Sequence, residues 1–172
     1  MADPRPGHRA LGFGVATVVL LLDQVSKWLI MGPVALRERG LIEITGFFDL
    51  RWVQNYGVSM GFLVAGSDRE RWLLVTVTAL IAAGIVLWIW REKARPDVAA
   101  LGLVLGGAIG NIADRTRFGY VVDFLDPHIG GWHPFLVFNV ADAAITIGVL
   151  ILVLRALFVR ESQAPAENVD AV

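Results

Sequence analysis

The chain of 172 residues contains no cysteine. This absence excludes disulfides, thiol nucleophiles, thiolate metal sites and lipid attachment to cysteine, and it leaves the redox compartment undetermined. Charge is also scarce, since charged residues make up 18% of the sequence and the formal net charge is −1. A soluble domain carries about 25% charged residues. The composition is therefore that of a membrane protein, and its charge gives no indication of a nucleic-acid partner.

Histidine is nearly as scarce, and its placement argues against two classes of peptidase. All the histidines lie outside the long apolar segments, so a serine triad within the membrane would lack its imidazole base. The H-E-x-x-H signature of zinc peptidases is absent from the sequence. Ser26 and Lys27 are adjacent in an apolar helix, so their side chains point apart and a Ser/Lys pair is poorly supported.

Asp126, His128 and His133 resemble a loose set of metal ligands. Turn-forming residues surround them, and no further firm ligand accompanies them. A solvated loop is the better interpretation of this segment. The sequence therefore predicts neither a metal nor any other cofactor.

Long apolar segments dominate what remains. Hydrophobic residues make up 56% of the chain, and the mean hydropathy is +0.62. Four segments approach the roughly 20 residues that cross a bilayer, namely residues 10–31, 72–90, 98–114 and 134–154. The first is too long for a cleavable signal peptide and contains Asp23 and Lys27, so it should remain as an anchor. We expect a single domain over residues 1–160, with a disordered cytoplasmic tail over 161–172.

Four spans place both termini on the same side of the membrane. The short turn over residues 91–97 is crowded with basic residues, and short basic loops face the cytoplasm. This predicts that both termini are cytoplasmic and that the long loops over 32–71 and 115–133 lie outside. Within the first of these loops, residues 47–55 alternate between apolar and polar, as in a half-buried strand.

Polar residues converge on the outer end of the predicted bundle. Asp142 and Asn139 lie within the apolar span 134–154, where a carboxylate costs roughly 2.5–3.5 kcal/mol at the centre. A helix that begins at Pro134 would carry Asp142 roughly 12 Å inward. Asn111 and Asp114 share one face in the last turn of the preceding span. These positions predict a site at the outer end of the bundle.

Two aspartates in a site of low dielectric share a proton, and together they can act as general acid and base. Asp142 supplies one of them, while Asp114 and Asp123 compete to be the other. The spacing alone slightly favours Asp114, because its position on a helix is better fixed.

The remaining polar and small residues have simpler interpretations. Asp23 and Lys27 are four residues apart and indicate a structural ion pair. Gly106 and Gly110 indicate close packing against the first or the fourth span. For Arg115, an interfacial anchor and a role in the site both stay open. Asn55 is interpreted as a turn residue unless it belongs to the site.

Five stretches resemble the bacterial lipoprotein signal peptidases (signal peptidase II), in the same order and over nearly the whole chain. They are LDQVSKWLI (22–30), VQNYGVSMGF (53–62), GGAIGNIADR (106–115), GYVVDF (119–124) and FNVADAAI (138–145). The resemblance implies that Asp123 and Asp142 are the catalytic pair, which replaces the preference for Asp114. Asp123 would then lie on a loop that could move as substrate enters. Substrate-binding or supporting roles are implied for Asn55, Asn111, Asp114, Arg115, Asn139 and Ala141.

The resemblance also implies a fold and a function. The fold would be an all-α membrane protein of four transmembrane helices, with a small extracytoplasmic β-sheet cradle and a short helix in the first long loop. The function would be that of an aspartic endopeptidase of the bacterial inner membrane, active near the outer leaflet. It would remove signal peptides from prolipoproteins by cleaving before the diacylglyceryl-modified cysteine. We expect a monomer in contact with membrane lipid. Ser59 and Met60 depart from the motif of the family.

Two other classes of function are compatible with buried carboxylates. A small proton-coupled transporter or channel subunit could use Asp142 and Asp23 as relay groups. Transporters usually hold their site near the midplane, often between repeated halves, whereas here the acids cluster at one end. A membrane assembly factor could use the same polar residues to join helices, and it would tolerate a change of Asp to Asn.

Overall fold

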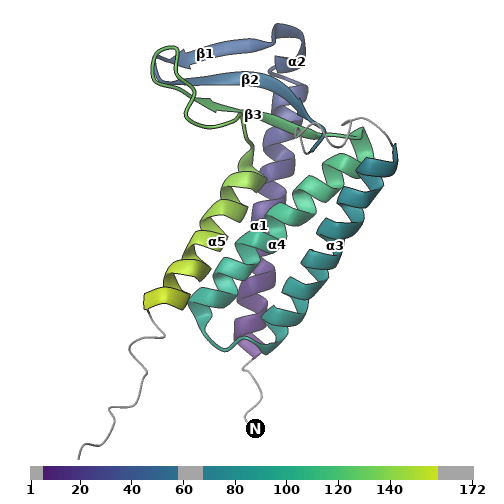
Figure 1. The fold of residues 1–172 in the computed structure, drawn as a ribbon, viewed down its shortest axis with the longest axis vertical. Helices are drawn as coiled ribbons and strands as arrows, with labels where there is room; N and C mark the ends of the chain where they lie inside the picture. Colours follow the sequence, from purple (N-terminus) through teal and green to yellow (C-terminus); the bar gives the residue numbers. More distant parts are fainter. Residues whose placement is uncertain (1–5, 58–67, 159–172) are drawn as a thin grey trace, which may run out of the picture.

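The computed structural model describes residues 6–57 and 68–158 of the chain. Four long helices form a bundle, and a three-stranded sheet lies across one end of it (Figure 1). The long helices are α1 (Pro6–Met31), α3 (Asp68–Arg91), α4 (Arg95–Phe118) and α5 (Val140–Phe158). The short helix is α2 (Leu36–Arg39), and the strands are β1 (Leu41–Thr45), β2 (Phe48–Asn55) and β3 (Val121–Pro127). The predicted fold class is confirmed.

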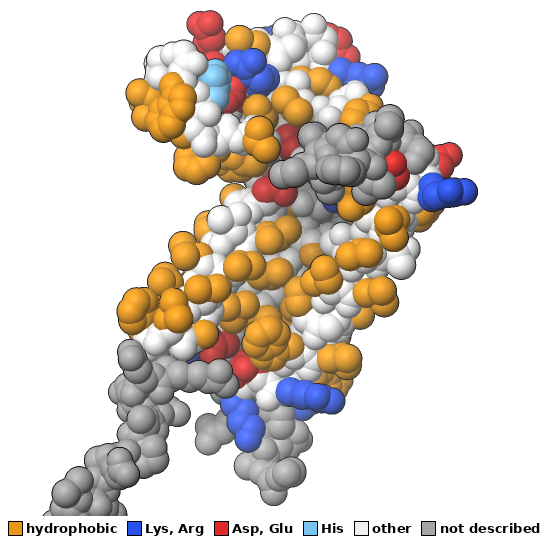
Figure 2. Space-filling model, viewed as in Figure 1, with side chains coloured by type: hydrophobic (Ala, Val, Ile, Leu, Met, Phe, Trp, Pro, Cys, Tyr) orange, Lys and Arg blue, Asp and Glu red, His pale blue; other side chains and the backbone are white. Residues whose placement is uncertain are grey.

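The four long helices are long and apolar enough to cross a membrane. Figure 2 shows hydrophobic side chains over the flanks of the bundle and charged side chains gathered at its two ends. The exposed apolar residues include Leu80 and Ile81 on α3 and Leu150 on α5. In water such a surface would be unfavourable, whereas in hydrocarbon it costs nothing. The chain is therefore a multi-pass membrane protein.

Helix α4 is the centre of the bundle, and it packs against α1, α5 and α3. Glycines allow this close approach. A Cβ atom at Gly106 would lie 2.5 Å from the carbonyl oxygen of Ala16 on α1. A Cβ at Gly107, on the adjacent face, would meet the carbonyl oxygen of Ala141 on α5. The face of α4 that contains Gly106 and Gly110, called the glycine face below, therefore packs against α1, which is the first predicted span.

The sheet is antiparallel, with strands in the order β1-β2-β3. Strand β2 closely matches the strand predicted over 47–55. An apolar cluster of Ile30 on α1, Leu36 on α2 and both Val122 and Phe124 on β3 fastens the sheet to the end of the bundle. The sheet therefore has a fixed position over the ends of α1, α4 and α5.

All four long helices differ by a few residues from their predicted limits, and the differences at α4 and α5 affect the site. Helix α4 covers Arg95–Phe118 rather than 98–114, so Asn111 and Asp114 precede its last turn. Helix α5 begins at Val140, not at Pro134. The segment before it pairs with β3 instead, because the N–H of Phe138 donates to the carbonyl of Leu125 at 3.1 Å. The predicted tail, and both Ser59 and Met60, lie outside the described residues.

The glycine face gives a stability test. Gly106→Ala places a methyl group against a backbone carbonyl that cannot move away, and overpacking of this kind costs about 1–3 kcal/mol. We expect a lower melting temperature in detergent, measured by the loss of helical circular dichroism. The matched control is Gly84→Ala on α3, where a Cβ would meet nothing within 4 Å. Equal melting temperatures for the two variants would contradict the assigned packing.

Candidate active site

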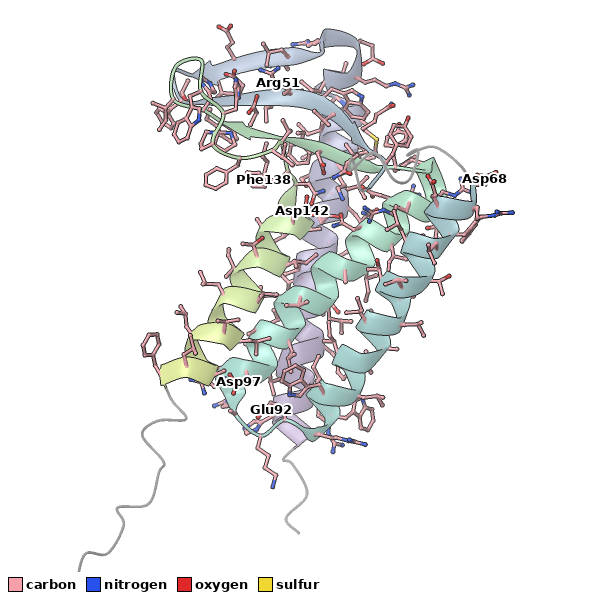
Figure 3. The ribbon with its side chains drawn as sticks, in the orientation of Figure 1. Arg51, Asp68, Glu92, Asp97, Phe138 and Asp142 are labelled. Carbon is pink, nitrogen blue, oxygen red and sulfur yellow. The ribbon has the colours of Figure 1, made fainter. Side chains whose placement is uncertain are left out.

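The first turn of α5 is closed by two reciprocal hydrogen bonds. The Asn139 side-chain oxygen accepts the N–H of Asp142 at 2.9 Å, and the Asp142 carboxylate accepts the N–H of Asn139 at 3.2 Å. This is the geometry of a capping box. The prediction of Asp142 deep within an apolar helix is therefore wrong. The residue lies at the start of the helix, beneath the sheet (Figure 3), where the helix dipole favours a negative charge.

Asp123 lies on strand β3, and the expectation of a movable loop is also wrong. Its side chain is 1% exposed. Residues alternate sides along a strand, so Val122 and Phe124 enter the apolar cluster while Asp123 faces the helix ends. One carboxylate oxygen accepts the Asn55 amide at 2.9 Å, and the other accepts the Asn139 amide at 2.6 Å.

A chain of amides joins Asp123 to Asp142. The Asn111 amide donates to Asp142 at 2.8 Å, and the Asn139 amide lies 3.4 Å from the oxygen of Asn111. Asn139 therefore contacts Asp123 with its amide nitrogen and caps Asp142 with its oxygen. The sequence predicted this convergence, but it did not predict which contacts produce it.

The two aspartates interact electrostatically. Burial raises the pKa of Asp123 to about 6, and the charge of Asp142 contributes in the same direction. Hydrogen bonds from Asn55 and Asn139 act against this rise, because they stabilise the carboxylate. Asp123 therefore keeps its proton to a much higher pH than an exposed carboxyl does. Such a pair can supply a general acid and a general base at the same time.

Arg115 belongs to the site region rather than to a free helix end. It is half-buried on α4, and it interacts electrostatically with the carboxylates of Asp142, Asp123 and Asp114. Its Nε atom is buried and has no hydrogen-bond partner among the described residues. Arg115 can therefore donate to a group that is not part of the described protein.

Asp114 has partners other than Asp142. Its carboxylate accepts Lys27 Nζ at 2.7 Å and the backbone N–H of Val122 at 3.1 Å. Asp23 forms the ion pair with Lys27 that the spacing indicated, at 2.9 Å, and it also accepts the N–H of Ala141 at 3.1 Å. These three charged residues lie beneath the aspartate pair and are buried.

Gln24 is a member of this polar cluster that the sequence analysis did not single out. Its amide donates to Asp23 at 3.1 Å and to Asp114 at 3.0 Å. The signal was available, because Gln24 is a polar residue within the apolar segment 10–31, next to Asp23. Its partner Asp114 is 90 positions away in the sequence, and local spacing gives no indication of that contact.

A groove of about 570 Å³ lies beside Asp142. Asp142 is the charged residue of its wall, and the rest of the lining is nearly all apolar. The segment before α5 contributes Phe135, Leu136 and Phe138, and α5 contributes Ile147. The groove therefore brings apolar chains of a ligand next to a carboxylate.

The interpretation of Asp126, His128 and His133 as a solvated loop is wrong for Asp126, which lies on β3, whereas His133 is exposed. Asp126 is 1% exposed, and it accepts Arg51 Nε at 2.6 Å and His133 Nδ1 at 2.8 Å. Burial alone would raise the pKa of Asp126, but these two hydrogen bonds outweigh it and lower the pKa. His128 lies 3.2 Å from Asp49. The group braces the sheet, and no cluster able to hold a metal occurs in residues 6–57 and 68–158.

Comparison with known proteins identifies the family. The family model described as Signal peptidase (SPase) II matches residues 15–158. A lipoprotein signal peptidase of Rhizorhabdus wittichii is 87% identical over 172 residues, which is all of both chains. One of Sphingopyxis alaskensis is 51% identical over 172 residues, or 100% of this chain and 99% of the relative.

Two solved structures, both bacterial membrane enzymes, have the same fold. One has a TM-score of 0.77 at 27% identity and covers 96% of each chain. The other has a TM-score of 0.74 at 29% identity and covers 91% of this chain and 96% of its own. The match to the family model extends from α1 to the end of α5. The chain belongs to the signal peptidase II family of aspartic peptidases.

Proposed function

We propose that Asp123 and Asp142 are the catalytic pair with which this signal peptidase II removes signal peptides from prolipoproteins. The observation that carries the assignment is the double role of Asn139. One side chain caps the helix that bears Asp142 and donates to Asp123. The two carboxylates are thereby held in one hydrogen-bonded unit at the edge of an apolar groove.

The raised pKa of Asp123 assigns the two roles. Asp142, as a carboxylate, removes a proton from a water molecule, and the oxygen of that water attacks the scissile carbonyl carbon. Asp123, as an acid, donates its proton to the carbonyl oxygen, which yields a tetrahedral diol. As the C–N bond breaks, Asp142 returns its proton to the amine and Asp123 recovers one from the diol. The pair ends in its starting state, with one proton between its two members.

Neighbouring side chains orient this pair. Asn55 holds Asp123 from β2, and Asn111 holds Asp142 from α4. Either amide can also bond the peptide backbone of a substrate. The unpartnered Nε of Arg115 suits a carbonyl oxygen of the bound peptide. Ala141 is small and buried between α4 and α5, where a larger side chain would separate these two helices.

The substrate we propose is a prolipoprotein cleaved directly before its diacylglyceryl-modified cysteine. The groove beside Asp142 supports this, because its apolar wall suits acyl chains or apolar side chains. Its wall includes Ile147 of α5, whose side chain is exposed on the flank of the bundle. A lipidated peptide could then enter from the bilayer without leaving hydrocarbon.

We propose that the enzyme resides in the bacterial inner membrane, with both termini cytoplasmic and the catalytic pair near the outer leaflet. Helix α1 begins and α5 ends at the end of the bundle opposite the sheet (Figure 1). Arg91, Lys93 and Arg95 connect helices at that same end, and such basic turns face the cytoplasm. The peptidase domain would cover residues 1–160 and act as a monomer in contact with lipid.

A proton-coupled transporter is not favoured. The polar residues gather beneath the sheet rather than at the midplane, and each described span is an unbroken helix. Transporter sites are typically built from discontinuous helices at the midplane.

Neutralising either aspartate tests the pair. Asp123→Asn and Asp142→Asn each remove a proton-transfer group, and such groups contribute roughly 10²–10⁴-fold to rate. We expect kcat on a diacylglyceryl-modified prolipoprotein to fall by that factor in detergent solution. Cleavage by either folded variant at the wild-type rate would contradict the assignment, and it would favour an assembly factor that tolerates asparagine.

The stability of Asp123→Asn separates catalysis from folding. The pKa of Asp123 is higher in the folded protein than its ordinary value of 3.8. Its contribution to stability is therefore present at low pH and is lost as pH rises through about 6. Asparagine removes the buried charge, so at pH values above 7 the variant should melt no lower than wild type. A large drop in melting temperature there would contradict the raised pKa.

The pH dependence of kcat/KM reports on the free enzyme. The value of kcat/KM should fall at acidic pH, where the pair as a whole holds a second proton, and again as pH rises through about 6, where Asp123 loses its proton. The Asn55 hydrogen bond lowers the pKa of Asp123, so Asn55→Ala should move the alkaline limb to higher pH. Gln54→Ala is the matched control, because Gln54 bonds Tyr56 and does not contact Asp123. If the alkaline limb of the Asn55→Ala profile stays at the wild-type pH, Asp123 is excluded as the titrating acid.

A further inference from the structure

Two backbone N–H groups in the site are held by buried carboxylates, and they occupy equivalent positions. Ala141 directly precedes Asp142, and its N–H donates to Asp23 at 3.1 Å. Val122 directly precedes Asp123, and its N–H donates to Asp114 at 3.1 Å. Each residue of the proposed catalytic pair is therefore held through the N–H group of the residue before it.

Lys27 joins the two gripping carboxylates. Its Nζ atom lies 2.9 Å from Asp23 and 2.7 Å from Asp114. The side chains of all three residues are at most 1% exposed. Gln24 adds a second, neutral link between the same two carboxylates. The two halves of the site are thus tied together by one buried cation and one amide.

The space for this arrangement is built into α4. A Cβ atom at Gly110 would lie 2.5 Å from the Asp23 carboxylate, so the absence of a side chain there lets Asp23 reach across to α5. The N–H of Ala141 is in the first turn of α5 and has no acceptor within its own helix. Asp23 supplies that acceptor from a helix that is distant in the sequence.

Stability alone is a weak reason for such a cluster. Burying charges costs desolvation, and well-packed apolar residues in place of a buried ion pair are often equally or more stable. What apolar residues cannot do is bond two specific N–H groups and fix the distance between them. The cluster therefore serves to fix the positions of the N–H groups of Ala141 and Val122.

We propose that Asp23, Lys27 and Asp114 form a clamp that sets the separation of Asp123 and Asp142. The three are positioning residues, since they act through the backbone of Ala141 and Val122. The proposal rests on the assignment of the catalytic pair. Lys27 and Asp114 tie β3 to the bundle, and Asp23 ties the start of α5 to the same cation.

The separation of the aspartates has a kinetic signature. Their mutual repulsion spreads apart the two apparent pKa values of the pair. If the carboxylates move apart, that repulsion weakens and the acid and alkaline limbs of the pH–rate profile approach each other. A change in a nearby charge instead moves both limbs in the same direction. The width of the pH–rate profile therefore reports the separation of the two carboxylates. A loss of stability elsewhere in the protein does not change this width.

Asp114→Leu and Asp114→Asn give the central test. Leucine removes the acceptor for Val122, whereas the oxygen of asparagine still accepts both Val122 and Lys27. For the leucine variant we expect kcat to fall roughly 10²-fold, as a displacement of about 1 Å can produce, with KM unchanged and a narrower pH profile. The asparagine variant should retain most of the wild-type kcat. An equal loss in both variants, or a profile of wild-type width in the leucine variant, would overturn the clamp.

A second variant applies if Asp114→Leu does not fold. The double change Asp23→Asn with Lys27→Met keeps the net buried charge and both backbone acceptors, and it removes the cationic link together with the Gln24 hydrogen bond to residue 23. It should lower kcat and narrow the pH profile, and a wild-type profile would overturn the proposal. The control is Asp97→Asn, which breaks the Asp97–Arg155 ion pair between α4 and α5 at the opposite end. It should lower the melting temperature and leave both kcat and the profile width unchanged.

These results are distinct from those that test the catalytic pair. If Asp123→Asn and Asp142→Asn are inactive while Asp114→Leu behaves as wild type, the pair stands and the clamp fails. If Asp123→Asn is active, the assignment of the pair fails, and the clamp fails with it.

Discussion

The site depends on the side chain of Asn139, which bonds in two directions. Its oxygen caps α5 at the N–H of Asp142, and its nitrogen donates to Asp123 on β3. One amide side chain therefore fixes the start of α5, the adjacent strand β3 and the pair of carboxylates. The pairing of Phe138 with Leu125 delivers Asn139 to this position, because it holds the chain against β3 immediately before α5 begins. The cap of the helix and the geometry of the site are consequently one structural feature.

Polar groups at this depth are tolerated because the structure gives each of them a partner. Asp23, Lys27 and Asp114 neutralise one another in part, and their remaining acceptor capacity is taken by backbone N–H groups. The glycine face of α4 makes this possible, since it brings α1 and α5 within reach of the same short stretch of α4. The buried polar cluster therefore depends on the close packing of the helices, because a larger residue at Gly110 would occupy the space of the Asp23 carboxylate.

The spans, the order of the elements and the strand over β2 could be predicted from the sequence, because length, hydropathy and alternation are local properties. Hydropathy could not predict the start of α5, because Pro134 and the apolar residues after it have the same pattern whether they pair with β3 or begin a helix. Asn139 and Asp142 have the spacing of a capping box, and that signal was available. The choice between Asp114 and Asp123 depends on contacts between distant segments. The spacing alone favoured Asp114, whereas the contacts join Asp123 to Asp142 through Asn139. The burial of Asp126 depends equally on Arg51, 75 positions away in the sequence.

The position of α5 also bears on the proposed hydrolysis. A carboxylate in the middle of an apolar helix would be without water, and an aspartic peptidase requires water as its nucleophile. Because α5 begins at Val140, Asp142 lies where the bundle meets the sheet, close to β3. The apolar groove reaches the same carboxylate from the side of the helices. In the proposed mechanism, water would reach the pair from the side of the sheet, and an apolar substrate would reach it from the groove. Both routes depend on where the segment paired with β3 gives way to α5, at Asn139.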